Sequence, residues 1–174
     1  MKYGKNGFCI PGILLVLGLM LTSGCGDKKS EEKKAEMATE AIMKAATGKD
    51  VDVDIQDGNV EIKDKDSTTQ MKKTSEWPAD MFSDVPRFPS GRIERVNKTS
   101  EATGRRAFNI HMADIDMSVV NQYADLLKAE GWQANVTLLG DKGAMLSGQK
   151  NNLGMSFPFN SEKKNGVLMV FGTR

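Results

Sequence analysis

The sequence predicts an α+β fold: an antiparallel sheet with one packed helix, in the order β-β-α-β-β-β-β, preceded by a small helix plus β-hairpin unit. Three observations lead to this prediction. A long amphipathic helical pattern occupies residues 116–131, short segments of alternating apolar and polar residues lie on both sides of it, and an Asp-Gly pair centres a separate hairpin within residues 51–63. Strands joined by short turns pair in antiparallel order, and a single helix can then cover one face of their sheet.

Residues 1–24 are predicted to be a signal peptide. A basic head that contains Lys2 and Lys5 precedes an uncharged apolar run from Phe8 to Leu21. A run of about 14 residues suits the core of a signal peptide, whereas a membrane-spanning helix needs about 18 or more apolar residues.

The five residues at the exit of this run, "LTSGC", resemble the lipobox of bacterial lipoproteins. The resemblance implies cleavage between Gly24 and Cys25 and attachment of diacylglycerol to the Cys25 thiol, often with a further chain such as palmitate on the new amino group. Because each buried methylene contributes about 0.8 kcal/mol, two or three long chains hold a protein on a bilayer almost irreversibly. The alternatives are a disulfide between Cys9 and Cys25 or a buried thiol, but Cys9 lies in the part that cleavage removes.

The residues after the cysteine bear on the location of the protein. In Gram-negative lipoproteins an aspartate directly after the cysteine retains the protein in the inner membrane, and here Gly26 takes that place with Asp27 one residue later. The resemblance therefore implies the periplasmic face of the outer membrane, held through lipid on Cys25, with the outer face of the plasma membrane as the alternative.

Residues 25–30 are predicted to be a polar tether, and residues 31–65 a helix plus β-hairpin unit. The helix extends from about Glu31 to Thr47, and Gly48 is placed to end it. Its expected buried stripe follows the helical spacing of three and four residues and comprises Ala35, Ala38, Ile42 and Ala45.

The hairpin prediction depends on the Asp57-Gly58 pair, which is typical of a type I′ turn. This turn sets the register of the two strands. The expected pairs are Ile55 with Val60, Val53 with Ile62, and Asp52 with Lys63. The aspartates of this segment do not match a calcium loop, because the place that needs glycine holds Asp57.

Residues 66–91 are predicted to be a linker and a proline-rich wrap. The polar stretch 64–77 has no periodicity, and three of the five prolines of the chain follow between residues 77 and 93. Trp77, Phe82 and Phe88 are expected to fix this extended segment on the domain surface.

Residues 92–174 are predicted to be the main α+β domain. Two strands, near residues 92–97 and 107–112, precede a helix that Asp116 can cap and Gly131 can end. Four further strands are expected near residues 133–139, 144–149, 155–159 and 167–171. Pro158 cannot donate a hydrogen bond to a neighbouring strand, which predicts an edge position or a bulge for its strand.

The last predicted strand is the candidate interaction face. All five of its residues are apolar: Val167, Leu168, Met169, Val170 and Phe171. Such a strand either is central with both faces covered, the preceding helix and hairpin being the obvious cover, or it presents its second face to a partner.

The sequence offers little for catalysis or metal binding. Its single histidine, His111, is expected on the polar face of a strand, where a solvent-facing or structural role is usual. No Cys–His or Ser–His–Asp catalytic set can be built without this residue. With 24 basic and 23 acidic residues, the chain lacks the positive charge that nucleic acid would need. We therefore predict a non-catalytic interaction or structural module with an unidentified envelope protein as partner and without a cofactor. The alternative is a binder of a small ligand or lipid in a pocket between helix and sheet.

Four segments also resemble a group of bacterial envelope lipoproteins for which no activity is established. These segments are "ATGKDVDVDI", "VEIKDKD", "WPADMFSDVPRFPSGRI" and "YADLLKAEGW". The resemblance implies a location and a domain layout, and it supplies no catalytic residue.

Overall fold

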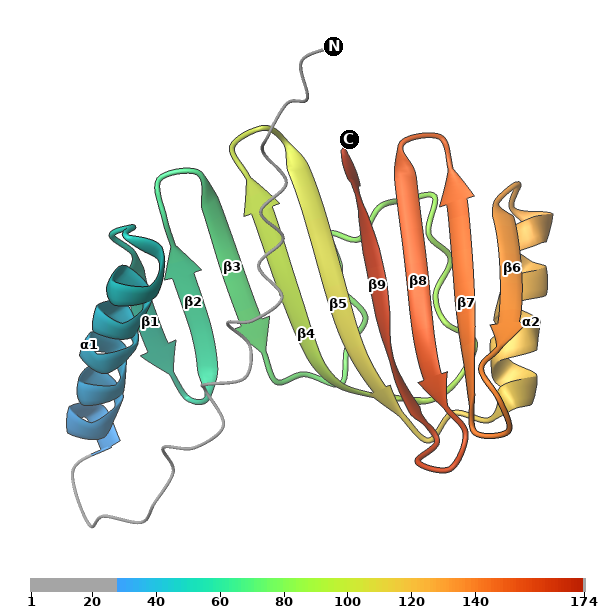
Figure 1. Cartoon of the computed structure of the whole chain (residues 1–174), viewed down its shortest axis with the longest axis horizontal. Helices are drawn as coiled ribbons and strands as arrows, with labels where there is room; N and C mark the ends of the chain where they lie inside the picture. The colour runs from blue at the N-terminus through green and yellow to red at the C-terminus, as the bar shows by residue number, and fades with distance from the viewer. Residues whose placement is uncertain (1–27, 174) are drawn as a thin grey trace.

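Figure 1 shows the computed structural model of the chain, which describes residues 28–173. The predicted signal peptide, the cleavage between Gly24 and Cys25, and the lipid on Cys25 lie outside the described residues. Within the described part, no helix is both long enough and apolar enough to cross a membrane.

One antiparallel sheet of nine strands forms the frame, in the order β1-β2-β3-β4-β5-β9-β8-β7-β6. The elements are α1 (Lys28–Thr47), β1 (Asp52–Gln56), β2 (Asn59–Lys63), β3 (Ser67–Lys72), β4 (Arg92–Glu101), β5 (Arg105–Ala113), α2 (Met117–Ala129), β6 (Gln133–Leu138), β7 (Gly143–Lys150), β8 (Leu153–Asn160) and β9 (Asn165–Thr173). The predicted α+β fold is confirmed, with the order β-β-α-β-β-β-β from β4 onward and a helix and hairpin before it.

The hydrophobic core lies on one face of the sheet, under α2 and the segment between β3 and β4. Alternate residues of β5, β7, β8 and β9 point into it, and α2 contributes Val120, Tyr123, Ala124 and Leu127. The expected aromatic anchors of the proline-rich segment are present, since Phe82 and Phe88 are buried and Trp77 packs against the core. The Tyr123 hydroxyl donates to the Pro86 carbonyl at 3.0 Å, and Trp132 Nε1 donates to the Asp84 carbonyl at 2.9 Å.

The predicted hairpin forms with the expected register. Ile55 pairs with Val60, Val53 with Ile62, and Asp52 with Lys63. The turn residues Asp57 and Gly58 have φ values of 52° and 77°, as a type I′ turn requires.

The predicted stripe of α1 is wrong in its direction. Of its four residues only Ala35 is half-buried, whereas Ala38, Ile42 and Ala45 are exposed. The helix instead turns Glu32, Glu36 and Glu40 toward β1, where their carboxylates accept backbone N–H groups.

Three smaller predictions also need correction. The stretch predicted as an unstructured linker contains β3, which pairs with β2 and β4. Pro158 lies in β8, an interior strand without a register shift, and the pairing with β9 is interrupted beside it. Asp116 precedes α2 without forming a side-chain cap and pairs with Lys164 at 2.8 Å instead.

The N-terminal helix and hairpin do not cover β9, although the sequence predicts them as the obvious cover for its second face. Strands β1 to β3 extend the sheet sideways, and α1 lies in front of β1 at the far edge (Figure 1). The central position of β9, between β5 and β8, agrees with one part of the prediction.

Candidate functional site

The predicted interaction strand divides its side chains between the two faces of the sheet. Leu168 and Val170 are fully buried in the core. Val167, Met169 and Phe171 point to the opposite face, which we call the open face. Only the second group can meet a partner, so two of the five predicted interaction residues serve the core.

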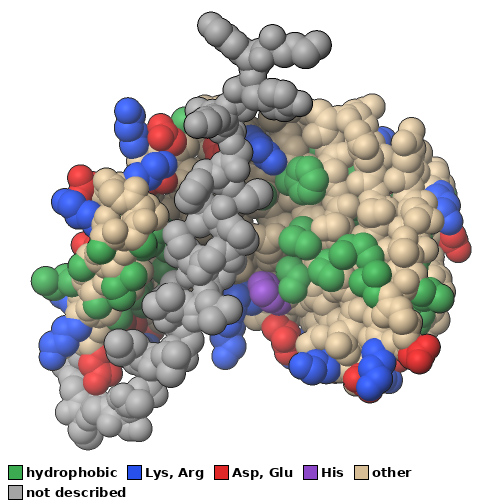
Figure 2. All heavy atoms as spheres, viewed as in Figure 1, with side chains coloured by type: hydrophobic (Ala, Val, Ile, Leu, Met, Phe, Trp, Pro, Cys, Tyr) green, Lys and Arg blue, Asp and Glu red, His purple; other side chains and the backbone are tan. Residues whose placement is uncertain are grey.

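The open face carries an apolar patch, and the periodicity of the sequence alone does not predict which residues form it. Directly paired residues lie on the same face of a sheet, and the pairs Ala107–Phe171 and Met145–Pro158 bring four apolar side chains to this side. We define the open-face patch as Ala107, Met145, Pro158, Val167, Met169 and Phe171. Figure 2 shows hydrophobic side chains gathered over this part of the sheet.

Phe171 is the most exposed member of the patch, with 42% of its surface accessible. It pairs with Gly154, and a Cβ at Gly154 would lie 2.5 Å from Phe171 Cζ. The glycine therefore lets the phenylalanine ring lie flat on the neighbouring strand. This packing holds the ring in place while one side of it faces outward.

His111 borders the patch, where it pairs with Val167. Its burial, together with the charge of Arg95, lowers the pKa of His111 below the ordinary value. Its side-chain contact is the Asn97 amide, at 3.4 Å from Nε2. Among residues 28–173 no cluster of three histidine, cysteine or acidic residues could hold a metal ion. This neighbourhood suits a polar rim of a binding surface.

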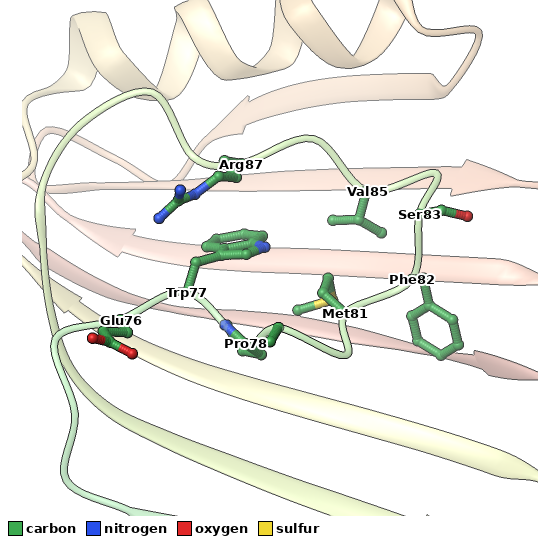
Figure 3. Close-up of a pocket in the computed structure, with 9 residues that line it drawn as sticks. Glu76, Trp77, Pro78, Met81, Phe82, Ser83, Val85 and Arg87 are labelled. Atoms are coloured by element: carbon green, nitrogen blue, oxygen red, sulfur yellow. The ribbon is translucent and has the colours of Figure 1, made fainter.

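A hollow of about 580 Å³ lies in the proline-rich segment, lined by residues 76–79, 81–83, 85 and 87. Figure 3 shows Trp77 and Arg87 side by side there, with the carboxylate of Glu76 turned away from them. This hollow is formed by a loop that packs on the sheet. It therefore differs in place from the pocket between helix and sheet that the sequence suggested.

Arg106 fastens this loop to the sheet. Its Nη1 donates to the Asp80 carbonyl at 2.9 Å, and its guanidinium lies 4.5 Å from the centre of the Phe82 ring. Lys98 Nζ lies 2.5 Å from the Asp80 carboxylate. Burial opposes ionisation of Asp80, but the hydrogen bond from Lys98 and the charge of Arg106 outweigh it, so the pKa of Asp80 is lowered.

The β1 edge of the sheet is closed by a row of glutamates from α1. Glu40 accepts the Val53 N–H at 3.1 Å, Glu36 accepts the Ile55 N–H at 2.9 Å, and Glu32 accepts the Asp57 N–H at 3.1 Å. Four residues of a helix rise about 6 Å, and two residues of a strand span about 6.6 Å, so the two spacings match. We call these three contacts the glutamate ladder.

The apolar spacing of α1 does not predict the glutamate ladder, although the sequence contains a signal for it. Glutamates recur every four residues at 32, 36 and 40, directly before a strand with outward N–H groups at every second residue. Apolar spacing predicts a different inward face for α1, the one with Ala35, Ala38, Ile42 and Ala45. At this sheet edge, hydrogen-bond acceptors decide which face of the helix turns inward.

No family model, no curated protein and no solved structure matches this chain.

Proposed function

We propose that the protein is a non-catalytic binding module of the bacterial cell envelope that docks a protein partner on the open-face patch. The lipid predicted on Cys25 would hold it at the periplasmic face of the outer membrane. The observation that carries the proposal is the apolar patch itself. An antiparallel sheet with one solvated face normally alternates apolar and polar residues, yet β9 carries apolar side chains in both directions.

The composition of the patch supports a protein partner. Met145 and Met169 are flexible and adapt to irregular surfaces, and Phe171 offers a rigid aromatic contact. His111 and Asn109 lie next to the patch on β5 and supply polar atoms at its border. An apolar centre with a polar border is the usual composition of a protein–protein interface.

The experiment tests whether binding depends on the patch. A photo-crosslinking amino acid is placed at Ser156, which pairs with Met169 on the open face, and crosslinks are formed in living cells. The double variant Met169→Gln, Phe171→Ser should lose the crosslinked product. Met37→Gln makes a similar change on the outer side of α1 and should leave the product intact. A product that survives in the double variant would contradict the proposal.

The anchor is tested separately by mass spectrometry of the protein purified from membranes. We expect the mature chain to begin at Cys25 and to carry the mass of diacylglycerol and acyl chains. A free thiol at Cys25, or a chain that retains residues 1–24, would contradict the envelope anchor without affecting the test of the patch.

A second candidate function is the binding of a small ligand, and the hollow beside Trp77 favours it. Trp77 and Arg87 both line this hollow, and an aromatic ring with a cationic group would suit a flat anionic molecule (Figure 3). Native mass spectrometry of the intact protein should then show a bound molecule that Trp77→Ala releases. Loss of open-face crosslinks in the same variant would instead indicate damage to the fold.

A further inference from the structure

Strand β6 forms the second edge of the sheet, and it differs from the β1 edge in the hydrogen-bond partners of its outward backbone groups. Leu139 N–H donates to the Gly143 carbonyl at 2.8 Å, which shows that the backbone of Leu139 points toward β7. Backbone groups alternate along an antiparallel strand, so Thr137 and Asn135 also point to β7. The N–H and C=O groups of Ala134, Val136 and Leu138 therefore point away from the sheet.

Within residues 28–173, β6 pairs only with β7, and no side chain bonds to its outward N–H groups. The strand "QANVTL" contains no lysine, no acidic residue and no proline. Natural sheet edges usually carry one of these features, because an unprotected row of donors and acceptors binds further strands. The β6 edge has the chemistry of a strand-binding site.

We propose that the β6 edge binds an extended segment of a partner protein by β-strand addition. Backbone hydrogen bonds to Ala134, Val136 and Leu138 would supply the affinity. Leu138, which is 68% exposed and lies on the same face as Ala134 and Val136, would contact apolar side chains of the segment. The segment should be apolar at alternate positions on the α2 side and polar on the side of Asn135 and Thr137.

A second copy of the chain does not fit this edge in the antiparallel arrangement. Helix α2 packs against β6, as Figure 1 shows at the right of the sheet. Pairing of two β6 strands about a two-fold axis would place both α2 helices on the same face. Neighbouring strands lie about 4.8 Å apart, whereas packed helices need 8–10 Å between their axes. A segment without a covering helix avoids this clash.

This inference does not rest on the open-face patch, because β6 lies at the edge beyond β7. The two surfaces can therefore bind independently, and a test of one leaves the other intact.

The test uses the full chain in detergent micelles and a short synthetic peptide that alternates valine and threonine between terminal lysines. Amide hydrogen exchange is measured by NMR with and without the peptide. Exchange at Ala134, Val136 and Leu138 should slow by about tenfold or more at saturation. Asn135 and Thr137, which already bond to β7, should change little. A matched peptide with methyl groups on all of its backbone nitrogens, which blocks both of its edges, should not produce this pattern.

A pair of variants separates backbone pairing from side-chain contact. Val136→Pro removes an outward N–H and leaves the pairing with β7 in place, whereas Val136→Ala shortens the side chain and keeps the N–H. The proline variant should bind the peptide about tenfold more weakly than the alanine variant. An unchanged chemical-shift spectrum around Phe108 and Leu146 checks that both variants keep the core.

Three results would overturn the inference. Equal peptide affinity of the two variants would show that the outward N–H is not used. Peptide-induced shifts confined to Met169 and Phe171 would place binding on the open-face patch instead. Slow exchange of the three outward amides in the free protein, together with a dimer in sedimentation, would show that a second copy occupies the edge.

Discussion

Strands β1 and β6 are the two edge strands of one sheet, and they differ in whether their outward N–H groups have hydrogen-bond acceptors. At β1 the outward N–H groups of Val53, Ile55 and Asp57 donate to glutamate side chains of α1. At β6 the corresponding N–H groups meet no acceptor within residues 28–173. A helix thus ends the sheet at one side through its side chains, and the sheet can be extended only at the other side.

The two helices also differ in how firmly they are held. Helix α2 buries four residues in the core, whereas α1 has no buried residue. The contact between α1 and the β1 hairpin therefore depends on the glutamate ladder, on a small area around Val53 and on the exposed ion pair between Lys28 and Asp57. We expect this contact to open locally, well below the free energy that unfolds the core.

The largest expected effect follows from removing the glutamate ladder. The triple variant Glu32→Ala, Glu36→Ala, Glu40→Ala leaves three N–H groups without acceptors. At about 1 kcal/mol for each bond, amide exchange at Val53, Ile55 and Asp57 should become about a hundredfold faster. The uncovered β1 edge should also promote association of chains at high concentration, which sedimentation can measure.

The matched control replaces the same three glutamates by glutamine. Glutamine keeps a carbonyl oxygen that can accept the N–H and removes only the charge. Slow amide exchange should largely be retained in this variant. If the alanine variant exchanged as slowly as the native chain, the ladder would have no role in closing the edge.

This comparison also explains which parts of the fold could be predicted from sequence. The β1–β2 register was predictable, because one local feature, the Asp57-Gly58 turn, determines every pair after it. Strand β3 was not predictable because its residues are mostly polar and show no apolar–polar alternation. Residues on both of its faces are half-buried, so neither face is marked in the sequence as the inner one. The direction of α1 depends on N–H groups of a distant strand, which the periodicity of the helix does not contain.

The candidate site was predictable only in part for a similar reason. The sequence identified residues 167–171 as an apolar strand, but it could not separate Leu168 and Val170 from the outward residues without knowing which face α2 covers. Met145 and Pro158 join the patch through the pairing of β7, β8 and β9. Their membership depends on strand order, which a single sequence does not reveal.

A smaller effect is expected from shortening one valine on each edge strand. Val53 is 4% exposed where α1 packs on β1, and Val136 is half-buried beside the core under α2. Val53→Ala should lower the local opening free energy of the β1 edge by about 1 to 2 kcal/mol and leave the thermal unfolding of the core unchanged. Val136→Ala should instead lower the unfolding temperature of the whole domain.

Hydrogen exchange and calorimetry on both variants check this difference. If Val53→Ala also lowered the unfolding temperature of the core, the β1 edge and the core would unfold as one unit. The two edges would then differ in hydrogen bonding but not in local stability.

The smallest expected effect is a pH dependence of the local stability of the β1 edge. Lys28 Nζ lies 2.5 Å from the Asp57 carboxylate beside the last bond of the ladder, and this contact lowers the pKa of Asp57 below the ordinary value of 3.8. A lowered pKa in the folded state means that folding favours the charged carboxylate. The pair therefore stabilises the edge above about pH 3.8, and this contribution is lost as the pH falls through the folded pKa. The glutamine triple variant is the right background, because it leaves no carboxylate in the glutamate ladder. In that background, acid should speed the opening of the Asp57 amide relative to that of Thr137, which bonds to β7, and Asp57→Asn should abolish the difference. A pH response that persists in Asp57→Asn would assign it to another group. Both side chains are largely exposed, so added salt should weaken the effect further.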